Sequence, residues 1–314
     1  MMMRAGRWEA ALVVMLGAGL CARTARAYVV YRTEGGVPLS WRQTCIPITA
    51  YPGDLTDMPA TQVLGAAMAA AAAWSAQQNP GTFLVLPVSS SAQPTPSAVL
   101  DGRNTLIFRR ATWCNATVAD DTSGCSYDPA ALALTTVFAN TKDGAILDAD
   151  IEVNARYFTW TDLEIHPQDQ TKQDLQNALA HEMGHFIGLD HPCYEPGNPG
   201  ARPLDDLGNP APDCDTAPSD IQDDTMFPTA ESGQTSKRSL APDDQLAVHD
   251  IYPSSQDPML CPSAPGAEAS SGCRIAVVPA GPGRWQSVAT VAGLLVVLLA
   301  IRRRPARVGR RSQP

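Results

Sequence analysis

The stretch that most constrains this chain is residues 180–191, whose sequence is Ala-His-Glu-Met-Gly-His-Phe-Ile-Gly-Leu-Asp-His. His181 and His185 are four residues apart, so on a helix they share one face about a turn from each other. Gly188 stands where that helix must end, at a position that favours a residue able to take positive φ. The chain can then turn back and bring His191 beside the other two. The spacing therefore predicts a zinc site made of these three histidines.

Glu182 lies between the first two histidines and can reach a metal-bound water without being a ligand itself. Three neutral imidazoles leave one coordination position open, which is typical of a catalytic rather than a structural zinc site. Zinc would lower the pKa of that water towards roughly 7 and polarise a carbonyl group. Glu182 would take the proton as general base and pass it to a leaving amine. The pattern therefore indicates a hydrolytic site.

Residues 1–27 have the features of a secretory signal peptide. Basic residues precede an apolar run over residues 10–20, and a small-x-small cleavage site ends at Ala27. The apolar run is too short to span a bilayer, which disfavours a first transmembrane helix. We therefore expect an exported chain that begins at Tyr28.

The C-terminal region predicts a second sorting feature. A Ser/Pro/Ala/Gly-rich linker over residues 254–284 leads to the almost wholly apolar residues 285–301, and six arginines follow in a basic tail, residues 302–314. This composition is typical of a transmembrane segment with its C-terminus inside. With Gly272-Cys273 before it, the tail resembles the C-terminal sorting signals of myxobacterial surface proteins. That resemblance implies processing by a sorting protease or lipid attachment at Cys273, and the alternative is a permanent membrane anchor.

The charge of the exported region limits its partners. Residues 28–273 hold 11 of the 23 basic and 31 of the 32 acidic residues, a net charge near −20. Such a surface repels nucleic acid and anionic membranes. We therefore expect no nucleic-acid partner, and we expect a monomeric protein held at the cell surface or outer envelope, or released from it.

Six of the eight cysteines fall in the exported region once Cys21 and Cys273 are set aside, and an even number suits an oxidising compartment. The pairs that flank obvious loops are Cys114 with Cys125 and Cys193 with Cys214. Cys45 and Cys261 remain as a pair by elimination only. Cys45 could instead approach the metal.

Hydrophobic periodicity predicts an alternation of strands and helices. The predicted strands cover residues 46–51, 82–88, 104–109, 131–139 and 145–154. The predicted helices cover residues 59–78, 171–189 and 240–253, with Trp74 as a core anchor of the first and Thr171 as the cap of the second. Residues 192–224 form a long Pro/Gly/Asp-rich excursion.

The strand at residues 145–154 alternates apolar with acidic residues, which leaves two interpretations of Asp148, Asp150 and Glu152. Their oxygen atoms suit Ca²⁺. A solvated strand face is the other interpretation, and Asp120 and Asp121 present the same choice.

The long histidine motif, Met226-Phe227-Pro228 and the segment at residues 240–252 together resemble the matrixin branch of the metzincin zinc proteases. The resemblance runs from about Trp41 to Pro253, within a predicted catalytic domain of residues 28–253. It implies an α+β fold with a twisted, mixed five-stranded sheet and three helices. It also implies zinc on His181, His185 and His191, Glu182 as general base, and Met226 as an apolar floor beneath the metal.

Two departures from the matrixin pattern stand out. Phe227 occupies a position where many matrixins have tyrosine, and little sequence separates Ala27 from the first strand, so no propeptide with a cysteine switch is expected. The sequence thus predicts an exported zinc endopeptidase that acts on proteins or peptides. One alternative is a non-catalytic zinc-binding adhesin, in which Glu182 would have no purpose. The other is a structural envelope protein, in which the zinc motif would have no purpose.

Overall fold

The fold is built on one mixed sheet. The computed structural model describes residues 28–114, 127–196, 201–261 and 294–303. In these residues seven strands run in the order β10-β11-β5-β6-β4-β2-β3. They are β2 (Ile48–Tyr51), β3 (Val88–Ser90), β4 (Thr105–Arg109), β5 (Ala131–Asn140), β6 (Ile146–Asn154), β10 (Thr229–Ala230) and β11 (Leu294–Arg303). Strands β3, β2, β4 and β6 are parallel, whereas β5 is antiparallel to β6.

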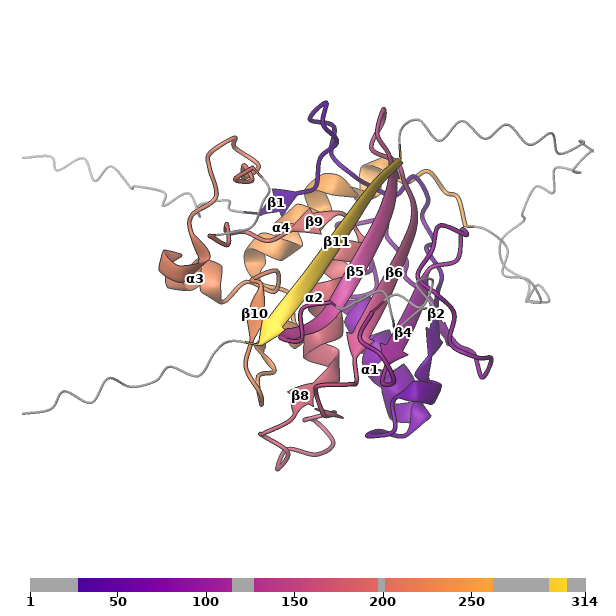
Figure 1. Cartoon of the computed structure of the whole chain (residues 1–314). Helices are drawn as coiled ribbons and strands as arrows, with labels where there is room; N and C mark the ends of the chain where they lie inside the picture. Colours follow the sequence, from indigo (N-terminus) through magenta and orange to yellow (C-terminus); the bar gives the residue numbers. More distant parts are fainter. Residues whose placement is uncertain (1–27, 115–126, 197–200, 262–293, 304–314) are drawn as a thin grey trace, which may run out of the picture.

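The described part of the chain also contains four α-helices, two short strand pairs and several single-turn 3-10 helices. The helices are α1 (Ala60–Trp74), α2 (Leu175–Phe186), α3 (Ser219–Gln222) and α4 (Pro242–Ile251), and the strand pairs are β1 (Val29–Val30) with β9 (Leu189–Asp190) and β7 (Trp160–Thr161) with β8 (Gln173–Asp174). The long helices α1 and α2 pack against each other, and α2 contacts β5 and β6. Figure 1 shows both helices on one side of the sheet. The mixed sheet agrees with the prediction, but the described residues form seven strands in it instead of five and four α-helices instead of three.

Helix α1 buries most of the apolar stripe that its periodicity predicts, although Met68, which the predicted stripe includes, is 53% exposed. Val63, Ala67, Ala71 and Trp74 recur every three or four residues, and all four are at most 1% exposed. The indole Nε1 of Trp74 donates a hydrogen bond of 2.7 Å to the carbonyl oxygen of Ala180. Trp74 is therefore the core anchor that the sequence predicts, and it ties α1 to the start of the histidine motif.

Helix α2 is shorter than predicted at both ends. Its N-cap is Asp174, whose side chain accepts a hydrogen bond from the backbone N–H of Asn177 (2.8 Å). Thr171 is not the cap, because Gln173 and Asp174 first pair with β7 as strand β8. A short polar side chain at this point satisfies one of the free N–H groups of the first turn.

The predicted strand at residues 82–88 is mostly absent. Only Val88 belongs to a strand, β3, and the preceding residues run beside residues 44–48 with single bridges such as that between Cys45 and Val85. Pro87 interrupts a continuous ladder because it has no N–H to donate.

The acidic face of β6 differs from both interpretations of its sequence. Asp148, Asp150 and Glu152 are at most 1% exposed, so they do not form a solvated face. Asp148 accepts hydrogen bonds from the backbone N–H groups of residues 101 and 102, and Asp150 accepts one from the N–H of Thr105. Within the described chain, these carboxylates do not form a group that could hold a metal ion. The loop before β4 covers this face, which the alternation alone cannot reveal.

Two disulfides fix the periphery of the fold. Cys193 and Cys214 form a disulfide within the long excursion. Cys45 and Cys261 join the segment just before β2 to the chain beyond α4. Two disulfides indicate an oxidising compartment outside the cytoplasm. Cys45 therefore does not approach the metal site. Cys125 and Cys273 lie outside the described residues, so the Cys114–Cys125 pair and the sorting site stay predictions.

The apolar C-terminal run forms a strand where it is described. Residues 294–303 are β11, which pairs antiparallel with β5 from Leu294 opposite Asn140 to Arg302 opposite Ala131. A Leu/Val-rich run suits a strand as well as a membrane helix. No helix in the described ranges has both the length and the apolar character needed to cross a membrane. Residues 285–293 lie outside these ranges, so the membrane segment stays a prediction.

Candidate metal centre

Three buried histidines meet at the C-terminal end of α2. His181 and His185 lie one turn apart on α2, and His191 follows β9. Their ring centroids are 4.7 Å apart for His181 and His185, 4.8 Å for His185 and His191, and 5.3 Å for His181 and His191. The structure thus brings together the three side chains that the sequence predicts as metal ligands. Among the described residues, no other group of three or more His, Cys, Asp or Glu side chains is arranged to hold a metal ion.

Backbone carbonyls fix the orientation of two of these rings. Nδ1 of His181 lies 2.8 Å from the carbonyl oxygen of Thr225, and Nδ1 of His185 lies 2.8 Å from that of Leu189. Since a carbonyl only accepts, each Nδ1 must carry the proton. In the neutral ring the lone pair is then on Nε2, which is the tautomer that a metal-binding histidine with such an outer partner adopts.

The Nε2 atoms fit a zinc ion. Nε2 of His181 is buried without a hydrogen-bond partner among the described residues, and Nε2 of His185 lies 3.1 Å from Nε2 of His191. Nitrogens bound about 2.0–2.1 Å from a tetrahedral zinc would lie about 3.3 Å apart. The lone pairs of unprotonated nitrogens that face one another in a buried site repel each other. A cation bound between them would relieve this repulsion.

The surroundings keep the three imidazoles neutral. Burial lowers the pKa of His185 to about 3 and holds the pKa values of His181 and His191 well below their usual range. The ammonium group of Lys237 acts in the same direction on all three pKa values. Neutral imidazole is the form that binds a metal ion.

Glu182 stands beside the histidines and is fully buried. Its Oε2 accepts a hydrogen bond of 2.5 Å from the hydroxyl of Thr135 on β5, and its Oε1 accepts one of 3.2 Å from the backbone N–H of Ile301 on β11. Burial raises the pKa of Glu182 to about 8, against the opposing effect of the Thr135 hydrogen bond. The carboxyl group is therefore held in place and binds a proton more tightly than an exposed glutamate does.

Met226 packs directly beneath the histidine helix. It is 2% exposed, and a Cβ placed on Gly184 would lie 2.1 Å from its Sδ. Only glycine between the two helical histidines leaves room for this sulfur. Gly188 has φ +99°, and a Cβ there would lie 2.4 Å from the carbonyl oxygen of Leu39. The two glycines of the motif therefore serve close packing and the turn towards His191.

The end of α2 is held by aromatic side chains from distant parts of the chain. Nε1 of Trp41 donates a hydrogen bond of 2.9 Å to the carbonyl oxygen of Phe186, and the hydroxyl of Tyr252 donates one of 2.6 Å to that of Ile187. Tyr252 in turn accepts from the N–H of Trp41 at 3.1 Å. These bonds satisfy carbonyls that the last turn of a helix leaves free. They fix the point at which the chain turns towards His191.

Lys237 is a residue of this region that sequence reasoning missed. Its side chain is buried, and its ammonium donates to the carbonyl oxygen of Thr225 at 3.1 Å and also to that of Phe227. Thr225 is the residue whose carbonyl orients His181. Burial lowers the pKa of Lys237 to about 7, although the nearby carboxyl groups of Asp244 and Asp224 raise it. A lysine in a polar loop gives no sequence signal of such burial.

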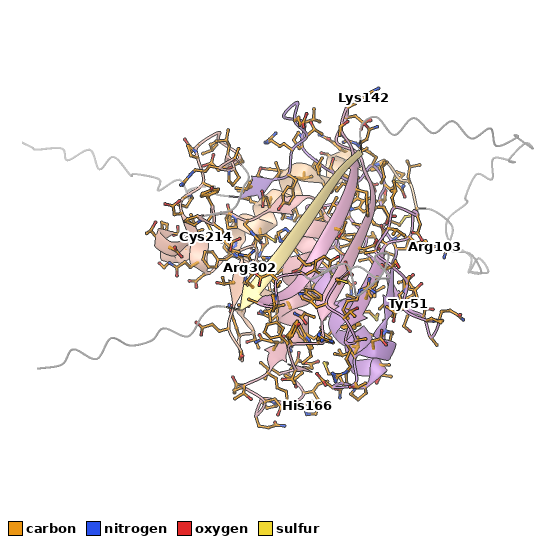
Figure 2. All side chains as sticks on the ribbon, in the orientation of Figure 1. Tyr51, Arg103, Lys142, His166, Cys214 and Arg302 are labelled. Atoms are coloured by element: carbon orange, nitrogen blue, oxygen red, sulfur yellow. A yellow bond between two sulfur atoms is a disulfide. The ribbon has the colours of Figure 1, made fainter. Side chains whose placement is uncertain are left out.

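Tyr31 is a second residue that the sequence did not single out. Its hydroxyl donates a hydrogen bond of 2.5 Å to Oδ1 of Asp190, the residue before His191, and its ring centroid lies 6.2 Å from that of His185. Strand β1 pairs with β9 beside it, so the start of the described chain supports the third histidine. His166, by contrast, lies on a loop at the lower edge of the view in Figure 2 and is not part of the histidine cluster.

No protein-family model matches the chain, and no curated protein matches it either. The assignment of the site therefore rests on its own geometry.

Proposed function

We propose that this protein is an exported zinc-dependent endopeptidase of the matrixin-like metzincin type that hydrolyses peptide bonds in proteins or peptides. The observation that supports this most strongly is the buried cluster of His181, His185 and His191, with the buried Glu182 next to His181 on the same helix. A structural zinc site closed by four protein ligands would not need a buried carboxylate next to it.

Each side chain has a separate part in the proposed reaction. His181, His185 and His191 would hold a zinc ion, which when bound supplies a polarised water and an electrophile for the peptide carbonyl. During hydrolysis the water oxygen adds to the carbonyl carbon and the C–N bond breaks. Glu182 would accept a proton from the water and return it to the leaving nitrogen. The hydroxyl of Thr135 orients the carboxylate throughout.

The test is hydrolysis of casein or a quenched peptide by the purified, zinc-loaded chain with and without chelator. Glu182→Ala should abolish hydrolysis while the chain still binds zinc. Glu34→Ala, which removes an exposed glutamate, is the matched control and should leave hydrolysis unchanged. The Ile301→Asp variant is assayed in parallel, because β11 lies over the site in the wild-type structure. Zinc binding without hydrolysis by either form would contradict the proposal and favour a binding module.

A further inference from the structure

Strand β11 lies where an extended peptide would have to lie to meet Glu182. Without it, β5 would be an edge strand whose backbone N–H and C=O groups are free to pair with another chain. β11 pairs with β5 from Leu294 opposite Asn140 to Arg302 opposite Ala131. Figure 1 shows it running alongside β5.

The C-terminal end of β11 lies between β5 and the segment that contains Pro228 and Thr229. On one side it pairs with β5, and on the other the N–H of Arg302 donates a hydrogen bond of 2.8 Å to the carbonyl oxygen of Pro228. Pro228 follows Met226 and Phe227, and Thr229 of β10 then pairs parallel with Arg302. The segment is therefore bound on both sides by backbone hydrogen bonds, as a peptide seated in a cleft is.

The amide nitrogen of Ile301 faces the proposed general base at 3.2 Å from Oε1 of Glu182. This is within the reach required of a base for a proton that it exchanges with a reacting group. The Ile301 side chain is fully buried in the core cluster that also contains Met226. The peptide bond between Ala300 and Ile301 thus has its nitrogen in the place that the leaving amine of a substrate would occupy.

The ion pairs of Arg302 support the same placement of β11. Arg302 is 3.3 Å from a carboxylate oxygen of Asp128 and 3.6 Å from one of Glu195, with its side chain 45% exposed. Figure 2 marks Arg302 at the end of β11. Exposed ion pairs contribute little energy, so Ile301 and the backbone ladder carry most of the attachment.

From these contacts we propose that residues 294–303 are an intramolecular peptide ligand that occupies the substrate cleft and keeps the protein latent until the segment is withdrawn. This inference rests on the proposed function, because it assigns the occupant of that same cleft. The same apolar run cannot pair with β5 and cross a bilayer at once, so insertion into a membrane or removal of the segment opens the site.

The first test asks whether β11 occupies β5 in the full chain. Leu298 lies opposite Thr136 in the antiparallel pair, and such partners share a face of the sheet. Thr136→Cys with Leu298→Cys should form a disulfide that mass spectrometry detects after digestion. The control is Thr136→Cys with Leu299→Cys, since a shift of one residue places the second side chain on the other face. Equal cross-linking of both pairs, or of neither, overturns the inference.

The second test asks whether β11 excludes other peptides. It uses the zinc-loaded full chain with Glu182→Gln, which cannot cleave its ligand, and a fluorescein-labelled peptide of residues 297–303. Adding Ile301→Asp, which places a charge in a buried apolar position beside residue 182, should tighten binding at least tenfold by fluorescence anisotropy. Met259→Asp, at a position 80% exposed, should leave binding as in the parent. Equal affinity of the parent and the Ile301→Asp form overturns the inference.

Hydrolysis separates this inference from the proposed function. With Glu182 intact, Ile301→Asp should cleave an added peptide at least tenfold faster than the wild-type chain. If Ile301→Asp binds the labelled peptide more tightly but cleaves nothing, the proposed function fails and occupation of the cleft stands. If wild type and Ile301→Asp both cleave the added peptide, and at the same measurable rate, the function stands and the latency inference fails.

Discussion

The hydroxyl of Thr135 donates a 2.5 Å hydrogen bond to the carboxylate of Glu182, which joins the central part of β5 to the middle of α2 across 47 positions of sequence. The bond is buried, so it is shielded from competing water. It sets the direction in which the second carboxylate oxygen points. In this structure that oxygen faces the amide nitrogen of Ile301.

Replacing Thr135 with valine should therefore lower kcat more than it changes KM. The carboxylate would keep its place in the chain but lose the bond that orients it, and we expect a loss of about tenfold, equivalent to about 1.4 kcal/mol of transition-state stabilisation. Steady-state kinetics of the Ile301→Asp form, which has an open cleft, provide the measurement, and zinc content should not change.

The neighbouring Thr136 is the matched control. Its buried hydroxyl has no hydrogen-bond partner among the described residues. Thr136→Val makes the same chemical change on the same strand and should leave kcat unchanged, with stability equal or slightly higher. An equal loss of kcat in both variants would mean that the strand, not the hydrogen bond, determines the effect.

Lys237→Met should weaken zinc binding. The variant keeps most of the side-chain volume but removes the ammonium that donates to the carbonyl of Thr225, and that carbonyl orients His181. Loss of such outer partners typically costs about 10- to 100-fold in metal affinity. Competition with a chromophoric chelator measures the affinity.

Lys172→Met is the control for this prediction. Lys172 pairs with Asp169 on the surface at 2.7 Å, with its side chain 38% exposed. Removing this exposed pair should leave zinc affinity unchanged. An unchanged zinc affinity in Lys237→Met would show that Thr225 is held by other contacts alone, such as the bond from its N–H to Asp244.

The parts of the site that sequence predicts are those encoded locally. The meeting of His181, His185 and His191 follows from a spacing of ten residues that one helix and one glycine turn fix. Trp74 follows from helical periodicity in the same way. Thr135 and Lys237 gave no signal, because their roles depend on partners brought in from elsewhere in the fold.

The features that the sequence leaves open have physical causes of the same kind. Alternation along β6 correctly predicted a strand, but the burial of Asp148 and Asp150 depends on a loop whose position no periodicity encodes. The apolar run at residues 285–301 suits a bilayer by composition, and part of it also suits the free edge of β5. Composition alone does not distinguish these two environments, since both are apolar and both require every backbone group to be paired.

Asp150 should make the protein less stable as the pH rises. Burial raises its pKa to about 8, with smaller contributions from the nearby Asp148 and Glu152, whereas in the unfolded chain it titrates near its usual value of about 4. Between these values the folded state holds a proton that the unfolded state has lost. Stability is then full below the unfolded pKa and falls by up to about 1.4 kcal/mol per pH unit towards pH 8.

Asp150→Asn removes this dependence and retains an oxygen that can accept from Thr105. We expect its free energy of unfolding to rise relative to that of the wild type as the pH increases from 5 to 8, measured by urea unfolding at several pH values. A difference between the two proteins that stays constant over this range would contradict the assignment of a raised pKa to Asp150.

Gly184→Ala should destabilise the protein and disturb the packing of Met226 against α2. The new methyl group would lie 2.1 Å from Sδ of Met226 and 2.9 Å from the ring of Trp74, so one of these buried side chains must move. Overpacking of this kind typically costs about 1–3 kcal/mol. Gly65→Ala makes the same substitution within α1, where a Cβ meets nothing within 4 Å, and should stabilise by about 0.5–1 kcal/mol because alanine favours a helix. Thermal and urea unfolding of the two variants should therefore shift in opposite directions. A shift in the same direction would show that helix propensity, and not contact with Met226, determines the residue at position 184.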